Sequence, residues 1–360
     1  MGDSAVKGRV LVLNTAFLGD VALTTPLFSL LAGDGWTVDA LVVPASAPLL
    51  DDHPHLNRVV VYDKRGEPGL GKLLSLGRDL RGRYDAVLVP HRSARSAILA
   101  LLTRAPVRIG YGPPKGPYTP PFTDRELRPK FTLWGFLYTH RVEYTLGRHE
   151  TLRICDLARP LGLSPSEEPR GVLGVGGGDA EWAEALFDRL SRPVIALFPG
   201  SLWETKLYPP ERYAAVAHDV IRRTGGSVVL MGGKADMDAA RVVIGGGAPG
   251  LSSLVGQTDL GRAKAVIAGA DLVLANDSGP IYMSSALGTP VVCVFGPTGV
   301  PGGFWPFGVP HRIVRVEGLE CRPCSLHGHR VCPLGHHRCM SELDPERVVA
   351  ACLALLGGGK

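Results

Sequence analysis

Short runs of β-branched and aliphatic residues alternate with longer amphipathic segments along the chain, and this alternation limits the fold more than any other feature. In the first half, the predicted strands are residues 9–14, 37–43, 58–63, 85–90 and 107–112, and the predicted helices are residues 20–32 and 69–82. Strands that are separated by helices form βαβ units, and such units build parallel sheets.

The same alternation starts again in the second half. The predicted strands there are residues 192–200, 227–233, 271–277 and 289–298, and the predicted helices are residues 209–225, 260–270, 279–288 and 344–357. The sequence therefore predicts an α/β protein with two successive doubly wound domains. Ligands of such folds bind at the carboxyl ends of the strands, so we expect the site in a cleft between the two domains.

Two irregular stretches set the predicted domain boundaries. Residues 112–130 are rich in proline and in basic residues, and we expect them to form a mobile loop. Residues 164–171 are a predicted linker. We therefore expect an N-terminal domain over residues 1–165 and a C-terminal domain over residues 172–343. The last helix, in residues 344–360, is expected to pack back on the N-terminal domain.

Positive charge is concentrated in the first half of the chain. Residues 1–165 carry 21 Lys and Arg against 15 Asp and Glu, whereas the remainder carries 18 against 19. This excess marks either a site for an anionic partner or an ordinary solvated surface. The sequence shows neither a secretory signal nor an apolar run long enough to cross a bilayer. We therefore expect a cytoplasmic protein whose cysteines are thiols or metal ligands.

Polar residues at two predicted strand ends of the second half are candidates for ligand binding. Asp277, Ser278 and Gly279 lie between a strand and a helix start, where unpaired N–H groups bind phosphate, although Asp277 also fits an ordinary helix cap. Lys206 follows the turn Gly200–Ser201, and a lysine in that position can neutralise a leaving diphosphate. A lone loop lysine is more often a solvated surface charge.

Asp20 is the candidate residue in the first half. It stands where a helix is expected to begin after the first strand, so it fits either a helix cap or a general base. The preceding loop lacks the pattern G-x-G-x-x-G, which argues against a dinucleotide-binding oxidoreductase.

Together these stretches resemble glycosyltransferase family 9, the bacterial lipopolysaccharide heptosyltransferases. "FLGDVALTTP" is similar to the family's LGD loop, "TKLYPPERY" to its TKxWP segment, and "NDSGPIYMSSALGTPVVCVFGPT" to its most characteristic block. "VRIGYG" and "RHETLRICDLARPLGL" also fall where the family has similar segments. The resemblance spans residues 9–345 in the expected order. Two positions depart from it: Tyr208 replaces the usual tryptophan, and Lys234 differs from some relatives near the adenosine of the donor.

The resemblance implies a GT-B fold of two Rossmann-like domains, an ADP-heptose donor, and inverting transfer that requires no cofactor. Asp20 would be the catalytic base, Lys206 would hold the donor phosphates, and Asp277 would bind the heptose hydroxyls. The diphosphate would lie at Gly200, Ser201, Ser278 and Gly279. Lys234 or Asp236 is expected near the ribose.

The implied acceptor is the phosphorylated and carboxylated core oligosaccharide on lipid A, and no nucleic acid is expected to bind. The enzyme would meet this acceptor at the cytoplasmic face of the inner membrane as a peripheral protein. The anionic acceptor favours the partner interpretation of the basic first half. The candidate contacts are Arg92, Arg95, Lys115, Arg128 and Lys130.

Other functions remain open at this point. Within the family, the alternatives are another nucleotide sugar as donor, or addition of the first or a later heptose. A more distant alternative is a non-catalytic, cysteine-rich binding protein on the same fold. The joint presence of Asp20, Lys206 and Asp277 argues against that alternative.

Four of the seven cysteines lie close together near the C-terminus, among several histidines. Cys321, Cys324, Cys332 and Cys339 have the spacing C-x2-C-x7-C-x6-C. A C-x2-C pair suits tetrahedral zinc, but the second pair is wider than in common zinc ribbons. The stretch resembles a segment of the heptosyltransferase II branch, which favours addition of the second heptose. We expect reduced, packed thiols ahead of a structural zinc ion, and a disulfide least.

Overall fold

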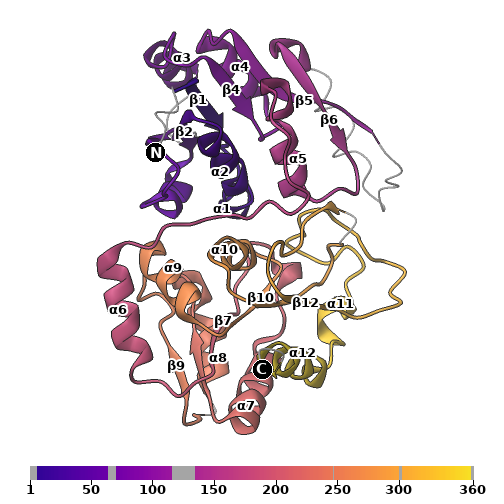
Figure 1. The fold of residues 1–360 in the computed structure, drawn as a ribbon. Coiled ribbons are helices and arrows are strands. Elements are labelled where there is room, and N and C mark those ends of the chain that lie inside the picture. The colour runs from indigo at the N-terminus through magenta and orange to yellow at the C-terminus, as the bar shows by residue number, and fades with distance from the viewer. Residues whose placement is uncertain (1–5, 64–69, 116–133, 246, 300–301, 358–360) are drawn as a thin grey trace. The chain divides into compact units, whose positions relative to one another are not determined.

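The chain folds into two compact units, Met1–Gly174 and Val175–Lys360. The computed structural model describes residues 6–63, 70–115, 134–245, 247–299 and 302–357. Each unit contains one six-stranded parallel sheet with helices packed against it (Figure 1). The predicted fold class, α/β with two doubly wound domains, is therefore confirmed. No helix in these described ranges has both the length and the apolar character that crossing a membrane requires.

The first sheet has the strand order β3-β2-β1-β4-β5-β6. Val10 of β1 lies opposite Val38 of β2 and Ala86 of β4, and all of these pairings are parallel. Central strands of a parallel sheet are covered on both faces, which explains the continuous apolar runs in β1 and β4. The strands are β1 (Gly8–Leu13), β2 (Trp36–Val42), β3 (Arg58–Val61), β4 (Ala86–Val89), β5 (Val107–Lys115) and β6 (His140–Thr145).

The helices of the first unit differ from the prediction in two ways: a helix over residues 94–102 was not predicted, and one predicted helix is divided. The predicted helix 20–32 is two helices, α1 (Leu18–Ala22) and α2 (Thr25–Gly33). Pro26 explains the break, because proline has no N–H to donate and its ring collides with the carbonyl four residues earlier. The other helices are α3 (Leu70–Asp79), α4 (Ala94–Leu102) and α5 (Glu150–Asp156), with 3-10 turns η1 (Pro44–Leu50), η3 (Gly135–Leu137) and η4 (Arg159–Leu161).

The prediction of a loop over residues 112–130 is wrong for its first four residues, which belong to a strand. Strand β5 continues through Pro113 and Pro114 to Lys115 and pairs with β6. The register shifts between Tyr111 and Pro114, and such a bulge is one of the few places where a sheet accepts proline. Residues 116–130 of the predicted loop, which include Arg128 and Lys130, lie outside the described residues.

The second sheet has the order β12-β11-β10-β7-β8-β9, which is the same topology as the first sheet. Leu274 of β10 lies opposite Leu197 of β7 and Val292 of β11. In both sheets, the strand order reverses between the first and fourth strands, β1 and β4 in one and β7 and β10 in the other. The strands are β7 (Val194–Phe198), β8 (Ser227–Leu230), β9 (Leu251–Ser253), β10 (Leu272–Asn276), β11 (Val291–Val294) and β12 (His311–Val314).

The four helices predicted in the second unit begin and end within one residue of their predicted limits, and three further helices among the described residues were not predicted. Helix α7 (Pro210–Thr224) is followed by Gly225 at φ +67°, and α10 (Gly279–Leu287) by Gly288 at φ +82°. Glycine adopts this left-handed conformation without steric cost, so both helices end where the sequence predicts. The others are α6 (Gly177–Phe187), α8 (Met237–Ile244), α9 (Leu260–Gly269), α11 (Arg338–Ser341) and α12 (Pro345–Gly357).

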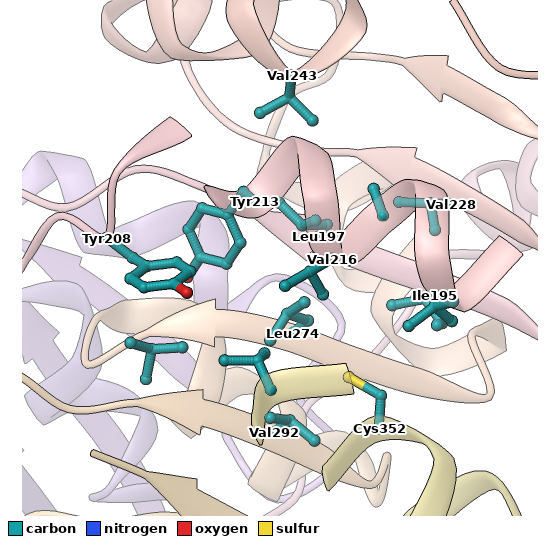
Figure 2. Close-up of a cluster of buried hydrophobic side chains, with 14 of the residues drawn as sticks. Ile195, Leu197, Tyr208, Tyr213, Val216, Val228, Val243, Leu274, Val292 and Cys352 are labelled. Carbon is teal, nitrogen blue, oxygen red and sulfur yellow. The ribbon is translucent and has the colours of Figure 1, made fainter. Parts of the chain in front are cut away.

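Helix α12 was expected to pack on the N-terminal domain. It belongs instead to the core of the second unit. Its side chains Val348, Val349 and Cys352 are buried in the same apolar cluster as Leu274 and Val292 of the sheet (Figure 2). Complete burial of a valine side chain stabilises a fold by roughly 1.5–3 kcal/mol. The apolar face of this helix therefore anchors it on the sheet beside α7.

Candidate active site

A buried ion pair lies at the end of β10, where the strand order of the second sheet reverses. Lys206 Nζ is 2.7 Å from Asp277 Oδ2, and the two side chains are 11% and 4% exposed. Thr298 donates a 2.6 Å hydrogen bond to the same carboxylate oxygen, and the hydroxyl of Tyr282 donates to Oδ1. The structure thus brings together two of the predicted donor-binding residues, and both carboxylate oxygens of Asp277 already accept hydrogen bonds.

Asn276, which the sequence analysis missed, ties the loops of this site together. Its amide nitrogen donates to the carbonyl oxygens of Pro199 and Gly200. Its Oδ1 accepts from the backbone N–H of Tyr208 and from the hydroxyl of Tyr213. The residue is fully buried. A polar residue at the end of an apolar strand was the available signal, because a buried amide must find partners for all its polar atoms.

The start of α10 and the end of β7 lie at the carboxyl ends of the two central strands, and their backbone groups face the same site. Ser278 is the N-cap of α10 and Gly279 is its first residue. Pro280 has no N–H and the Ile281 N–H donates to the Ser278 carbonyl, so the N–H groups at Ser278 and Gly279 are the ones that this helix start offers to a ligand. Gly200 passes so close to Asp236 that a Cβ at Gly200 would lie 2.0 Å from Asp236 Oδ1. A larger residue at this position would push the Asp236 carboxylate away. Ser201 follows and accepts a hydrogen bond from Trp203 N–H.

Asp236 stands at the edge of this arrangement, in the turn η6 (Lys234–Asp236). Its Oδ2 accepts a 2.8 Å hydrogen bond from Gly233 N–H. Burial raises the pKa of this carboxyl group, and the bond from Gly233 opposes the shift. The close contact with Gly200 joins the ends of β7 and β8.

Asp20 lies in the first turn of α1, just after β1. Its Oδ2 accepts a 3.1 Å hydrogen bond from Phe17 N–H, so the carboxylate caps the start of the helix. Its carbonyl oxygen accepts from Asn14 and Thr24 side chains. The capping interpretation is therefore correct, and it does not compete with a role as base, since a carboxylate offers about four acceptor positions.

A cluster of hydroxyl and imidazole groups, absent from the predictions, joins the ends of β1 and β4. Thr15 Oγ1 is 2.8 Å from His91 Nδ1 and 3.2 Å from Ser96 Oγ, and Ser93 Oγ lies 2.9 Å from Ser96 Oγ. Thr15 and Ser96 are almost completely buried. The cluster fixes the His91 ring at the point where the strand order of the first sheet reverses.

Arg92, one of the candidate acceptor contacts, is held against aromatic side chains. Its guanidinium lies 4.2 Å from the ring centre of Tyr144, a cation–π distance. It also lines a cavity of about 20 Å³, enough for one water molecule. The other lining residues are Val89, Ser93, Tyr111, Trp134, Gly135 and Tyr138.

The other described candidates are solvent-facing. Arg95 is exposed on α4. Lys115 forms a 3.1 Å ion pair with Glu143 of β6, with both side chains largely in solvent. Exposed pairs of this kind contribute little to stability and open easily, so Lys115 stays available to an anion.

The cysteine segment, residues 321–340, packs against the loop that carries Lys206. All seven cysteines of the chain are free thiols. Burial raises the pKa of Cys339 to about 11, and burial together with neighbouring Cys321 and Cys332 raises the pKa of Cys324. The four thiols therefore lie near one another, and the Cys339 thiol stays protonated at neutral pH. Across the described part of the chain, no three His, Cys, Asp or Glu side chains are placed to hold a metal ion.

Comparisons with known proteins identify the family to which a chain with this fold and site belongs. A sequence model of glycosyltransferase family 9 (heptosyltransferase) matches residues 73–334. The lipopolysaccharide heptosyltransferase 2 of Escherichia coli (strain K12) is 25% identical over 363 residues, covering 97% of this chain and 98% of the relative.

Solved structures agree in fold. The glycosyl transferase family 9 protein from Veillonella parvula DSM 2008 superimposes with a TM-score of 0.77 at 22% identity, and the alignment covers 98% of both chains. E. coli ADP-heptose lps heptosyltransferase II gives a TM-score of 0.72 at 24% identity over 97% of this chain and 99% of that one. The fold is thus that of the GT-B heptosyltransferases. On these grounds the chain belongs to glycosyltransferase family 9 (heptosyltransferase), and it is a glycosyltransferase.

Proposed function

We propose that this enzyme transfers L-glycero-D-manno-heptose from ADP-heptose to the inner core of lipopolysaccharide, where it adds the second heptose. Family membership and similarity to a heptosyltransferase 2 over nearly the whole chain support this reaction. The observation that carries the proposal is the buried pair Lys206–Asp277 beside the N-terminus of α10, at the point where the strand order of the second sheet reverses. Doubly wound sheets bind their ligands at this point.

The donor diphosphate is proposed to lie across the start of α10 and the turn after β7. Backbone N–H groups at Ser278 and Gly279 suit phosphate oxygens, because the helix dipole adds positive potential there. Gly200 and Ser201 line the neighbouring turn. Lys206 neutralises charge on the departing ADP. Asp277 Oδ1 has one hydrogen bond from Tyr282, so it retains a lone pair for a heptose hydroxyl.

Asp20 is proposed as the general base of an inverting displacement. Its carboxylate takes the proton of the acceptor hydroxyl while that oxygen attacks the anomeric carbon from the side opposite the diphosphate. One C–O bond forms, the bond to ADP breaks, and the electron pair leaves with the diphosphate. The step as drawn requires no cofactor.

The anionic acceptor is proposed to meet the basic residues of the first unit. Arg92 lies just after β4, on the same sheet edge as the loop of Asp20, and it is fixed against Tyr144. Lys115 and Arg95 are further candidates. Lipid A anchors the acceptor in the bilayer, so the enzyme is proposed to work as a peripheral protein at the cytoplasmic face of the inner membrane.

A donor screen tests the substrate. ADP-heptose and other nucleotide sugars are offered with acceptors that carry zero or one heptose. We expect turnover with ADP-heptose and the one-heptose acceptor. Turnover only with the acceptor lacking heptose would assign the first addition instead, and turnover only with another nucleotide sugar would replace the donor.

The variant Asp20→Asn tests the base. Asparagine keeps an oxygen for Phe17 N–H but takes up no proton, so we expect kcat to fall about 10²–10⁴-fold while ADP affinity is unchanged. Asp259→Asn is a matched control, because Asp259 caps α9 through a 2.9 Å bond from Arg262 N–H and has no proposed catalytic role. Equal kcat in the two variants would contradict the assignment.

A further inference from the structure

The cysteine segment, residues 321–340, forms hydrogen bonds with two loops of the candidate site. One loop carries Lys206, and the other carries Thr298, the hydroxyl partner of Asp277. On the lysine side it bonds to Thr205, the residue before Lys206, in the turn η5 (Glu204–Lys206). The Thr205 N–H and hydroxyl both donate to the His329 carbonyl, at 3.1 and 2.9 Å, and the hydroxyl accepts from His329 N–H at 2.8 Å. His337 Nε2 donates a 2.8 Å bond to the Thr205 carbonyl.

Gly328 touches the lysine itself. It has a φ of +97°, and a Cβ at this position would lie 3.2 Å from both Cγ and Cε of Lys206 and 2.9 Å from Cβ of Trp203. The lysine stem thus runs over the bare Cα of Gly328. Ser325, almost completely buried, accepts from the N–H groups of His327 and Gly328 and holds this turn in place.

The other end of the segment holds the loop that supports Asp277. Arg322 Nη2 donates a 3.1 Å bond to the carbonyl of Thr298, whose hydroxyl bonds the carboxylate. Cys324 N–H donates a 2.9 Å bond to the carbonyl of Pro297. One continuous segment therefore fixes the loop of the lysine and the loop of the carboxylate's hydroxyl partner.

We propose that the cysteine segment is the positioning element of the donor site, with Gly328 and His337 as the residues that set the place of Lys206. The inference rests on the proposed contact between Lys206 and the donor phosphates. A lysine side chain is a flexible four-carbon stem. Packing and hydrogen bonds from supporting residues are what hold such a group at one place in a site.

Two glycine variants in the same segment test this role. Gly328→Ala and Gly335→Ala both put a side chain at positive φ, +97° and +73°, but a Cβ at Gly335 meets no atom within 4 Å. Both changes therefore strain the backbone, and only the first presses on the lysine loop, at Trp203 and at the stem of Lys206. We expect Gly328→Ala to weaken ADP binding by about tenfold to a hundredfold, which is the effect of losing one hydrogen bond to a charged group. Gly335→Ala should bind ADP like the unchanged enzyme.

A histidine series gives a second measurement if Gly328→Ala does not fold. His337→Ala removes the donor to Thr205, and His337→Gln replaces it with an amide N–H on a side chain of similar reach. Both carry the same backbone strain at φ +48°. We expect weaker ADP binding in the alanine variant and recovery in the glutamine variant, with no change in His336→Ala, whose imidazole is exposed.

Lys206→Ala, measured in parallel by titration calorimetry with ADP, separates the two proposals. If it leaves ADP affinity unchanged, the proposed donor site is wrong and the positioning role falls with it. If it weakens ADP binding while folded Gly328→Ala matches Gly335→Ala, or while His337→Ala and His337→Gln match His336→Ala, only the positioning role is overturned.

Discussion

At the residue scale, the ion pair Lys206–Asp277 sets the charge of the proposed donor site in the absence of a ligand. Each partner compensates the other, and the hydroxyls of Thr298 and Tyr282 complete the shell of the carboxylate. A buried charge that loses its partner strongly destabilises the folded state. An intact ion pair, or two neutral residues of similar size in its place, does not. The pair is therefore a stability element as well as a candidate binding element.

This gives a stability prediction with an internal control. Lys206→Met or Asp277→Asn alone leaves one buried charge without its partner, and we expect each to destabilise the fold by about 3–5 kcal/mol, seen as a lower Tm. The double variant should recover part of the loss. Lys115→Met breaks the exposed pair with Glu143, so Tm should hardly change. Single variants with the Tm of the unchanged enzyme would contradict this account.

The sequence could identify the members of this site but not their contacts. Lys206 and Asp277 stood out because each follows a predicted strand in a turn. Their pairing depends on β7 and β10 being neighbours, a fact of sheet order that no local pattern contains. Asn276 was missed because it ends an apolar strand, and its role appears only when the loops it joins are in place.

At the element scale, the strands that the sequence missed are sheet edges. β6, β9 and β12 each pair with only one neighbour and are partly exposed, so they lack the continuous apolar run of a buried strand. Interior strands such as β1, β4 and β10 were predicted within one or two residues at each end. The sequence pattern therefore predicted the interior strands of both sheets but missed most of the edge strands.

The state of the cysteine segment is also a question at this scale. We expect reduced thiols, so iodoacetamide at about pH 8 should label half-buried Cys321 and Cys332 in the folded enzyme. Burial raises the pKa of both Cys155 and Cys352 to about 12, so these thiols stay protonated and unlabelled. Peptide mass spectrometry reads out the labelling.

Metal analysis of the same preparation distinguishes the alternatives. Stoichiometric zinc that is lost on Cys321→Ser, together with labelling only after chelation, would show a metal site. Labelling only after reduction would show a disulfide. Either result would contradict the expectation of packed thiols.

At the scale of the whole molecule, the two units share a topology but differ in charge. Residues 1–174 carry 22 Lys and Arg against 17 Asp and Glu, whereas residues 175–360 carry 17 of each. The proposed donor lysine is buried in the neutral unit, and the described acceptor candidates Arg95 and Lys115 are exposed on the basic one. Under the proposed function, the same topology serves two kinds of anion, a donor held in a buried site and an acceptor met at the surface.

This difference predicts that salt changes the KM of the acceptor more than the KM of the donor. Raising ionic strength from about 0.1 M to about 1 M shortens the Debye length from about 10 Å to about 3 Å, which screens exposed charges far more than buried ones. We expect KM for the lipopolysaccharide acceptor to rise several-fold while KM for the donor changes little. An Arg95→Ala, Lys115→Ala variant should show a weaker salt effect on the acceptor. An equal rise of both KM values, or a salt response that the double variant leaves intact, would place acceptor recognition elsewhere than on these basic residues.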